Sequence, residues 1–455
     1  MKHVGRLFGT NGVRGVINEG LTVEMALDIG RATATVLGPG NIALSQDSRM
    51  GGAMFTGAIT SGVLSTGCSV IDIGLAPTPT LQFVVPRLEC AAGLMITASH
   101  NPPEFHGIKV MGSNGIEVPR DVESKIESVY FNKDFKVAGW KEIGTSQRHE
   151  DAIRDYIDAI KLHVNKEEIA NRNLRVVIDC ANSVGALVTP LLLRELGCHV
   201  ISLNAQLDGK FPGRDPEPSP KNLSNLSKAV VSAGADIGIA HDGDADRATF
   251  VDENGQVLWG DQSFAIVASR VLSRKKGSVL VTPVSSGRLM EDIAKASKAK
   301  IDWTVVGSIV VSHRLEEIGA DLGGEENGGV FYPPHQSVRD GAMTVAQVVE
   351  IMSAEKKKLS ELVSELPHYF STKIKVPVES EKKEAVLKRL LKLTEGQERI
   401  TLDGVKLMYD DGWVLIRPSG TEPLWRCFSE ATTQKLADRL ADRGVSLIKE
   451  AINQL

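Results

Sequence analysis

The chain has 455 residues, of which 42% are hydrophobic and 24% are charged, and its formal net charge is −5. This length predicts three or four domains of ordinary soluble composition, and the small negative charge gives no reason to expect nucleic acid as a partner. The five cysteines are scattered and form no C-x-x-C pair, which argues against a disulfide framework or a zinc site. The first residues lack the apolar core of a leader, and later segments are too short to span a membrane. A cytoplasmic protein without a membrane partner is therefore expected.

The amino-terminal segment 8–15 places three glycines around Arg14. A glycine-rich loop lets the backbone approach a ligand closely, and the planar guanidinium of Arg14 is suited to phosphate. Taken alone, this pattern is a weak signal because many turns share it.

Three later segments repeat the order strand, helix, strand, helix, strand, which is typical of α/β domains with largely parallel sheets. The first repeat has strands at 42–47, 69–73 and 91–97 and helices at 52–65 and 79–87. The second has strands at 175–180, 199–203 and 236–240 and helices at 185–196 and 222–233. The third has strands at 278–283, 300–305 and 320–322 and helices at 288–296 and 308–318.

The chain beyond Pro367 follows a different plan. Residues 373–378, 404–409 and 413–417 alternate like strands, whereas 380–393 and 432–452 have helical spacing. The expected architecture is three similar α/β domains with mixed, largely parallel sheets, followed by a smaller α+β domain. The expected domain boundaries are 1–150, 151–255, 256–367 and 368–455.

The last strand of each repeat runs into an unusual polar loop. These loops contain Ser99 in the first repeat, the segment 241–247 in the second and the segment 323–329 in the third. Since open α/β sheets place their chemistry beyond the carboxyl ends of strands, the three loops are expected to converge on one ligand in a central cleft.

In the first of these loops, Ser99 follows a short apolar run and precedes Asn101 and two prolines, which end the strand. His100 is adjacent, and Lys109 lies shortly afterwards. A hydroxyl that carries or donates phosphate would thus have a proton handler and a cationic clamp nearby. The alternative is that Ser99 only caps a turn.

In the second loop, Asp242, Asp244 and Asp246 alternate after an apolar strand. Three carboxylates pointing to one side repel one another unless a cation lies among them, and their oxygens suit Mg²⁺. An EF-hand reading is disfavoured because Arg247 occupies the position of the sharp-turn glycine and a strand precedes the loop. The other alternative is a solvated acidic turn.

Two further loops have the composition of ligand-binding segments. Glu325 and Asn327 stand between glycines and could grasp vicinal sugar hydroxyls, although a simple turn is the alternative. In the last domain a fixed arginine, two hydroxyls and a glycine form a phosphate-binding pattern: Arg417, Ser419, Gly420 and Thr421. Arg426 is a weaker candidate for phosphate contact.

Four motifs, in the same order along the chain, resemble those of the α-D-phosphohexomutases. They are the opening loop around Arg14, the phosphoserine loop Thr97-Ala-Ser-His-Asn-Pro102, the Mg²⁺ loop Asp242-Gly-Asp-Ala-Asp-Arg247 and the phosphate loop 417–423. The sugar loop 324–329 shares the family frame but has Asn327 in place of the usual Ser. Asn11 and His106 are further departures, from Asp and Asn respectively.

The resemblance implies that Ser99 carries a phosphoryl group, which it lends to a hexose phosphate and takes back through a bisphosphorylated sugar. Arg14 and Arg247 would contact phosphate, Ser99 and the three aspartates would hold Mg²⁺, and His100 and Lys109 are the candidates for proton handling. A sugar 1,6-bisphosphate would serve as activator, and the family's habit suggests a homodimer. These motifs do not choose among glucose, mannose and glucosamine phosphates.

Two other functions remain open from the residues alone. A Mg²⁺-dependent sugar phosphatase with Asp242 as nucleophile would release phosphate and leave Ser99 without a role. A sugar-phosphate-binding protein without activity would bind hexose phosphates and not turn them over.

Overall fold

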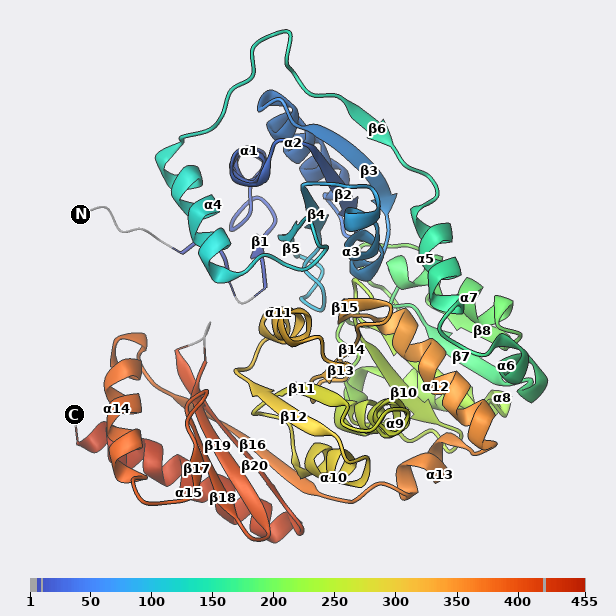
Figure 1. Ribbon diagram of the computed structural model, residues 1–455, viewed down its shortest axis with the longest axis vertical. Helices are drawn as coiled ribbons and strands as arrows, with labels where there is room; N and C mark the ends of the chain where they lie inside the picture. The colour runs from blue at the N-terminus through green and yellow to red at the C-terminus, as the bar shows by residue number, and fades with distance from the viewer. Residues whose placement is uncertain (1–5, 10, 420–422, 455) are drawn as a thin grey trace.

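The computed structural model describes residues 6–9, 11–419 and 423–454, which form four domains with one sheet each (Figure 1). The first domain contains β1 (Val13–Val16), α1 (Val23–Leu37), β2 (Asn41–Gln46), α2 (Gly52–Ser65), β3 (Ser69–Leu75), α3 (Thr78–Arg87), β4 (Ala92–Ile96), β5 (Phe105–Gly112), α4 (Arg120–Asn132) and β6 (Ser146–Arg148). Its sheet has the order β1-β5-β4-β2-β3-β6.

The second domain has a four-stranded sheet in the order β10-β9-β7-β8. Its elements are α5 (Ala152–Lys161), α6 (Lys166–Arg172), β7 (Arg175–Asp179), η1 (Val184–Leu187), α7 (Thr189–Glu195), β8 (His199–Leu203), η2 (Pro220–Asn222), α8 (Ser224–Ala233), β9 (Ile237–His241) and β10 (Ala248–Asp252).

The third domain has a five-stranded sheet in the order β12-β11-β13-β14-β15. Its elements are α9 (Gly260–Ser273), β11 (Val279–Pro283), α10 (Arg288–Ala296), β12 (Lys300–Thr304), α11 (Ser308–Ile318), β13 (Leu322–Gly324), β14 (Val330–Tyr332), β15 (Gln336–Arg339), α12 (Gly341–Glu355) and α13 (Leu359–Ser364).

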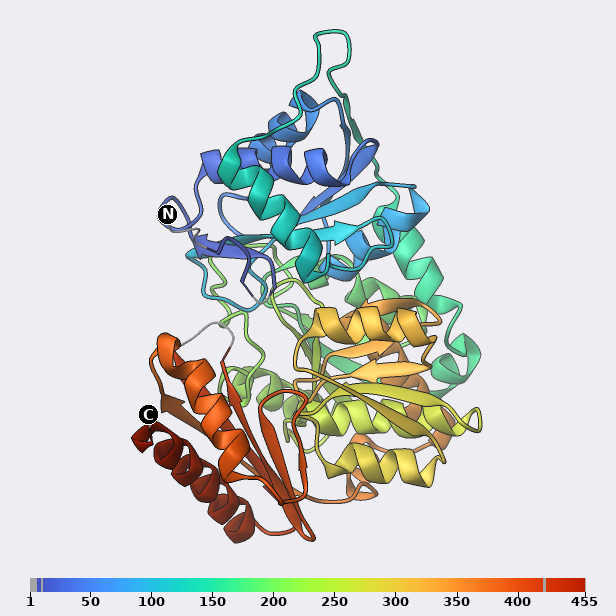
Figure 2. The same ribbon diagram turned by 60° about the vertical axis from the view of Figure 1, so that its left-hand side comes forward.

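The fourth domain is an antiparallel sheet, β16-β20-β19-β18-β17, with α14 and α15 packed on one face (Figure 2). Its elements are β16 (Phe370–Pro377), η3 (Ser380–Lys382), α14 (Lys383–Leu393), β17 (Arg399–Ile400), β18 (Val405–Tyr409), β19 (Gly412–Pro418), β20 (Leu424–Ala431) and α15 (Gln434–Asn453). No helix in the described part of the chain is both long enough and apolar enough to cross a membrane.

Alternation along β2 shows why the first sheet is buried on both faces. Ile42 and Leu44 belong to the core formed with α1 and α2, whereas Ala43 belongs to the core formed with α3. Side chains alternate between the two faces of a strand, so a continuous apolar run can serve two layers of helices. The buried strands of this domain thereby become a rigid base for the loop that follows β4.

The predicted convergence of loops has a common topological cause. Each polar loop connects a central strand to an antiparallel return strand: β4 to β5, β9 to β10, and β13 to β14. The first strand of each pair was predicted from the sequence, and the three return strands were not. The third of these first strands was predicted at 320–322 and lies at Leu322–Gly324, because Gly319 ends α11 in a left-handed conformation.

The predicted helices 185–196 and 380–393 are each divided into a short 3₁₀ turn and an α-helix, the latter into η3 and α14. Residues 185–196 were expected to form a single helix, and they form η1 followed by α7. Pro190 lies in the first turn of α7, where its missing N–H costs no hydrogen bond, so the α-helix starts there.

The second face of the fourth sheet packs against the third domain through a small apolar core that includes Val284, Trp413 and Leu415. Lys406 is fully buried within this junction. Its Nζ donates to the Ser286 carbonyl at 3.1 Å and lies 4.2 Å from the centre of the Trp413 ring. Burial lowers the pKa of Lys406 to about 8, although nearby Glu291 and Glu430 oppose that shift.

The lowered pKa of Lys406 gives the junction a pH dependence. Since the unfolded lysine binds its proton up to about pH 10.5, the unfolded state holds more protons between pH 8 and 10.5, and stability rises over that interval. The gain is about 3 kcal/mol at most. We expect Lys406→Met to remove this rise. Thermal unfolding of both proteins across the interval measures it.

Lys388→Met is the matched control for that experiment. Lys388 is on α14 of the same domain, is largely exposed and pairs with Glu384. It should retain the wild-type pH dependence. Identical pH profiles for wild type and Lys406→Met would contradict the prediction.

Candidate active site

Ser99 lies directly after β4 in a left-handed backbone conformation, with φ of 51°. This conformation is uncommon for residues other than glycine, and two contacts hold it. The Ser99 N–H donates to Thr97 Oγ1 at 2.8 Å, and Thr97 Oγ1 donates in turn to Asp47 at 2.5 Å. The conformation directs Ser99 Oγ toward the second domain, where it donates to Asp242 Oδ2 at 3.0 Å.

Arg49, which lies shortly after β2, holds the rest of this loop in place by hydrogen bonds. Its guanidinium donates to four backbone carbonyls, those of Ser99, Asn101, Pro102 and Phe105, at distances between 2.6 and 3.0 Å. Its Nε also pairs with Asp47 at 3.2 Å, and both side chains are fully buried. One arginine therefore satisfies several backbone carbonyls around this loop and keeps Ser99 in place.

The metal loop between β9 and β10 approaches the Ser99 loop as closely as a glycine permits. A Cβ on Gly243 would lie 2.3 Å from the Ser99 carbonyl oxygen, so no larger residue fits at this position. The close backbone approach explains how a serine and an aspartate from different domains come within hydrogen-bond distance.

Asp242, Asp244 and Asp246 are all buried, and one ligand oxygen of each lies within 4.8 Å of the others. Asp244 Oδ2 accepts from Thr78 at 2.6 Å and from Lys109 at 2.8 Å. Asp246 Oδ2 also accepts from Lys109, at 3.4 Å. The Oδ1 atoms of Asp244 and Asp246 are buried and have no hydrogen-bond partner among the described residues.

This donor set fits a hard divalent cation. Buried acceptors without partners are costly, and three carboxylates so close together repel. Burial and the neighbouring Asp246 raise the pKa of Asp242 to about 7. Lys109 acts in the opposite direction on Asp244, whose pKa is lowered by this ammonium in spite of burial. The three aspartates offer the carboxylate oxygen ligands that suit Mg²⁺.

Arg247 completes the edge of the site facing His100. Its guanidinium bonds Asp242 Oδ2 at 3.1 Å and Glu217 at 3.1 Å. The half-exposed His100 lies 3.3 Å from Ser99 Oγ through its Nδ1 and 3.8 Å from Glu217. Lys109, in contrast, lies on β5 and bonds the aspartates, which places it beside the metal loop rather than in the loop of Ser99.

The strands β1 and β5 pair with each other and carry Arg14 and His106 respectively. Arg14 contacts the Ser99 loop, whereas His106 is buried in the core. Arg14 donates to the Asn101 side chain of the Ser99 loop at 2.5 Å. His106 is fully buried, accepts from the Gly107 N–H at 3.0 Å and packs edge-on against Phe55. Burial lowers the pKa of His106 to about 3, so this departure from the family pattern is a neutral core residue.

In the sugar loop, the carboxylate of Glu325 is buried and the side-chain amide of Asn327 already accepts a hydrogen bond. Glu325 pairs with Arg339 at 3.5 Å, and Asn327 Oδ1 accepts from the Gly329 N–H at 3.0 Å. Burial raises the pKa of Glu325. The neighbouring Glu326 accepts from Ser285 at 2.8 Å.

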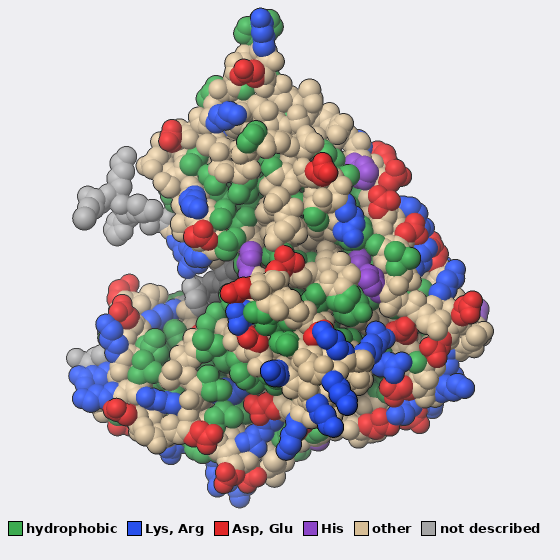
Figure 3. Space-filling view, in the orientation of Figure 1, with side chains coloured by type: hydrophobic (Ala, Val, Ile, Leu, Met, Phe, Trp, Pro, Cys, Tyr) green, Lys and Arg blue, Asp and Glu red, His purple; other side chains and the backbone are tan. Residues whose placement is uncertain are grey.

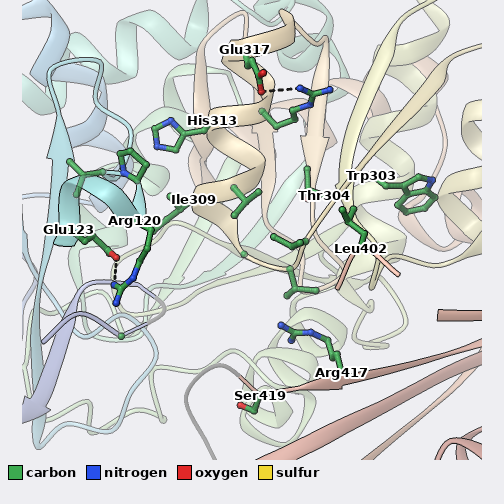
Figure 4. Close-up of a pocket in the computed structure, with 18 of the residues that line it drawn as sticks. Arg120, Glu123, Trp303, Thr304, Ile309, His313, Glu317, Leu402, Arg417 and Ser419 are labelled. Carbon is green, nitrogen blue, oxygen red and sulfur yellow. Dashed lines mark hydrogen bonds and ion pairs between the residues drawn. The ribbon is translucent and has the colours of Figure 1, made fainter. Parts of the chain in front are cut away.

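The described start of the phosphate loop borders a cavity of about 680 Å³ (Figure 4). Arg417 and Ser419 line it from the fourth domain, and Val306 and His313 line it from the third. Asp403 connects the third and fourth domains here, because it accepts a hydrogen bond from the Val306 N–H at 3.0 Å and forms an ion pair with Arg417 Nε at 2.9 Å. Gly420 and Thr421 lie outside the described residues. The hollow is visible between the first and fourth domains in Figure 3.

Comparisons with known proteins match the chain domain by domain. Models of the four successive domains of phosphoglucomutase/phosphomannomutase match residues 5–161, 154–255, 259–370 and 374–446. A "Phosphoglucomutase/phosphomannomutase" of Thermococcus kodakarensis is 47% identical over 99% of this chain and 100% of its own length. A "Phosphoglucosamine/phosphogalactosamine mutase" of Sulfurisphaera tokodaii is 42% identical over 96% and 98%.

Solved structures show the same architecture. A phosphoglucomutase/phosphomannomutase family protein from Burkholderia thailandensis superposes with a TM-score of 0.89 at 27% identity, covering 98% of this chain and 97% of that one. The chain belongs to the α-D-phosphohexomutase family. It is an intramolecular phosphotransferase that interconverts hexose phosphates.

Several residues that shape the site of this phosphohexomutase were not singled out from its sequence. They lie outside the recognisable motifs: Asp47, Arg49, Thr78, Glu117, Glu217, Arg339 and Asp403. Most act across long separations in the chain, and a single charged residue in an ordinary segment gives no local signal. The phosphatase and binding-protein alternatives are not favoured by the comparisons, since the relatives are mutases.

Proposed function

We propose that this phosphohexomutase works through a phosphorylated Ser99. The observation that carries the proposal is the hydrogen bond of Ser99 Oγ to Asp242, which brings a loop of the first domain onto the carboxylate cluster of the second. In the proposed reaction, the bond between Ser99 Oγ and phosphorus breaks while a bond forms from phosphorus to the free hydroxyl of a hexose phosphate. The bisphosphorylated sugar then turns over, and its other phosphoryl group returns to Ser99 Oγ.

Asp242, Asp244, Asp246 and the Ser99 oxygen are the proposed ligands of Mg²⁺. The buried Oδ1 atoms of Asp244 and Asp246, which have no hydrogen-bond partner among the described residues, support this assignment. When bound, Mg²⁺ supplies charge neutralisation and polarisation of phosphoryl oxygens. A hexose 1,6-bisphosphate is the proposed activator, because it can phosphorylate Ser99 and leave a monophosphate.

We assign proton transfer to His100, and we assign to Lys109 the role of balancing the charge of the aspartates. His100 Nδ1 lies within reach of Ser99 Oγ, so it can accept the hydroxyl proton of the sugar as the phosphoryl group leaves the serine. Lys109 is bonded to Asp244 and Asp246 instead. Arg14 and Arg247 are the proposed contacts of the transferring phosphate.

The remaining loops hold the substrate in this proposal. Glu325 and Asn327 contact the sugar, and Arg417, Ser419, Gly420 and Thr421 hold the phosphate that does not react. Because the residues that hold the non-reacting phosphate and the phosphoryl donor Ser99 lie in different domains, the sugar can bind with either of its ends toward Ser99. The domains are proposed to meet at residues 150/151, 255/256 and 367/368.

Glucose and mannose phosphates are the proposed substrates, in preference to glucosamine phosphate. The carboxylate of Glu325 is already paired with Arg339, and the oxygen of Asn327 is taken by Gly329, which leaves the Asn327 amide group to donate. Neutral hydroxyls suit such a lining better than the ammonium group of glucosamine. The higher identity to a phosphoglucomutase/phosphomannomutase points the same way.

Incubation with Mg²⁺ and a trace of glucose 1,6-bisphosphate tests these assignments. Glucose 1-phosphate should give glucose 6-phosphate without release of inorganic phosphate. We expect kcat/KM for glucose and mannose 1-phosphates to exceed that for glucosamine 1-phosphate by roughly tenfold or more, the factor that a polar mismatch of about 1.5 kcal/mol produces. A larger value for glucosamine 1-phosphate would refute the sugar assignment, and free phosphate would refute the mutase mechanism.

A further inference from the structure

We propose that Arg339 is a positioning residue that orients the carboxylate of Asp246, a proposed metal ligand, and links it to the sugar loop. The inference rests on the proposed function and deepens it, because it concerns how the metal loop and the sugar loop act together. Arg339 is the last residue of β15 in the third domain, and its side chain is 13% exposed.

The first arm of the link reaches the second domain. Arg339 donates to Asp246 Oδ2 at 2.5 Å, while Lys109 approaches the same oxygen at 3.4 Å. With Oδ2 bonded to two cations, Oδ1 is buried, has no hydrogen-bond partner among the described residues and lies 3.8 Å from Arg247 Nε. Groups that bond the non-ligating atoms of a metal ligand fix its orientation, and this is the arrangement around Asp246.

The second arm reaches the sugar loop. Another nitrogen of the guanidinium lies 3.5 Å from Glu325 Oε2. The stem of Arg339 also packs under this loop, since a Cβ on Gly329 would lie 2.6 Å from the Arg339 Cδ. The loop backbone and the carboxylate of Glu325 therefore both depend on where this arginine stands.

Asn11 of the first domain adds a third contact. With its amide nitrogen toward Glu117, its oxygen accepts from Arg339 at 3.3 Å. Glu117 in turn lies 3.6 Å from Lys109. An aspartate at position 11 would face Glu117 as a like charge, so Asn11 and Arg339 form one consistent arrangement that joins three domains.

The planar fork of arginine is needed for this geometry. Asp246 and Glu325 are reached by different nitrogens of one guanidinium, whereas a lysine offers a single point charge. Arg339→Lys should retain the attraction to Asp246 and lose the link to Glu325. Arg339→Gln should lose both.

The test measures metal affinity and sugar kinetics separately. Binding of Mn²⁺ to the dephosphorylated protein, without sugar, is followed by the electron paramagnetic resonance signal of free Mn²⁺. We expect Arg339→Gln to raise the Kd for Mn²⁺ by about 10- to 100-fold, the usual effect of removing a group that orients a metal ligand. The KM for glucose 1-phosphate should rise as well. Arg339→Lys should bind Mn²⁺ within a few-fold of wild type and still show the raised KM.

Arg154→Gln is the matched control, because Arg154 on α5 also bonds two carboxylates, Asp158 and Glu195, on the protein surface. It should leave Kd and KM unchanged. A folded Arg339→Gln protein with wild-type Kd for Mn²⁺ would overturn the inference. Should Arg339→Gln not fold, wild-type Kd and KM in Arg339→Lys would overturn it equally.

These outcomes are distinct from failure of the proposed function. If the wild-type protein released inorganic phosphate or did not isomerise glucose 1-phosphate, the mechanism through Ser99 would fall. If the wild type isomerised the sugar and did not bind Mn²⁺, only the inference about Arg339 and the metal assignment would be lost.

Discussion

Ser99→Ala is expected to reduce the conversion of glucose 1-phosphate by roughly 10⁴-fold or more, because it removes the atom that carries the phosphoryl group. The substitution deletes one buried hydroxyl whose partners are Asp242 and His100, and it leaves the backbone contacts of Arg49 in place. Folding should therefore be retained. Coupled-assay rates with saturating Mg²⁺ and glucose 1,6-bisphosphate measure the loss.

Mass spectrometry gives an independent readout of the same variant. The wild-type protein incubated with glucose 1,6-bisphosphate should gain one phosphoryl group, and Ser99→Ala should gain none. Ser446→Ala is the control, since Ser446 lies on α15 and bonds only a carbonyl of its own helix. Full activity in Ser99→Ala would exclude the mechanism through this serine.

Removal of the divalent cation is expected to have the second largest effect. Chelation should reduce turnover by roughly 10³-fold or more, since phosphoryl transfer depends on neutralised phosphoryl oxygens. Adding Mg²⁺ should restore the rate. Asp244→Asn should give a comparable loss that Mg²⁺ does not restore, because it removes a buried carboxylate at the centre of the cluster.

Asp244→Asn also has a structural consequence. Lys109 loses the shortest of its ion pairs and keeps the longer ones to Asp246 and Glu117. The variant should therefore unfold at a lower temperature than wild type. Asp438→Asn is the control, because Asp438 on α15 accepts only from exposed polar groups. A chelator-treated protein or an Asp244→Asn variant with wild-type turnover would contradict the metal assignment.

Apolar strands and regular helices could be predicted from local pattern alone. The segment 92–96 is continuous and buried, and its end at Ser99 follows from the polar and proline residues after it. The return strands were missed because their patterns are mixed. β5, for example, contains His106, Gly107 and Lys109, and these residues become strand through pairing with β4 and β1.

The candidate site divides in the same way. Ser99 and the three aspartates occur in compact motifs, so their chemistry could be read before their positions were known. Arg339 and Thr78 occur in ordinary segments, and each acquires its role only through a partner far along the chain, Asp246 and Asp244 respectively. Contacts between residues so far apart in the chain leave no local sequence pattern.

The sequence by itself determined the order of the domains, the strands that end at the polar loops and the residue types available for phosphate and metal. The tertiary structure alone decided which carboxylate oxygens accept hydrogen bonds from cations and which have no hydrogen-bond partner among the described residues. The reason is physical: strand and loop preferences depend on neighbours a few residues away, whereas the charge balance around Asp244 and Asp246 depends on Lys109 and Arg339. These two cations come from different domains, and only the packing of those domains brings them to the aspartates.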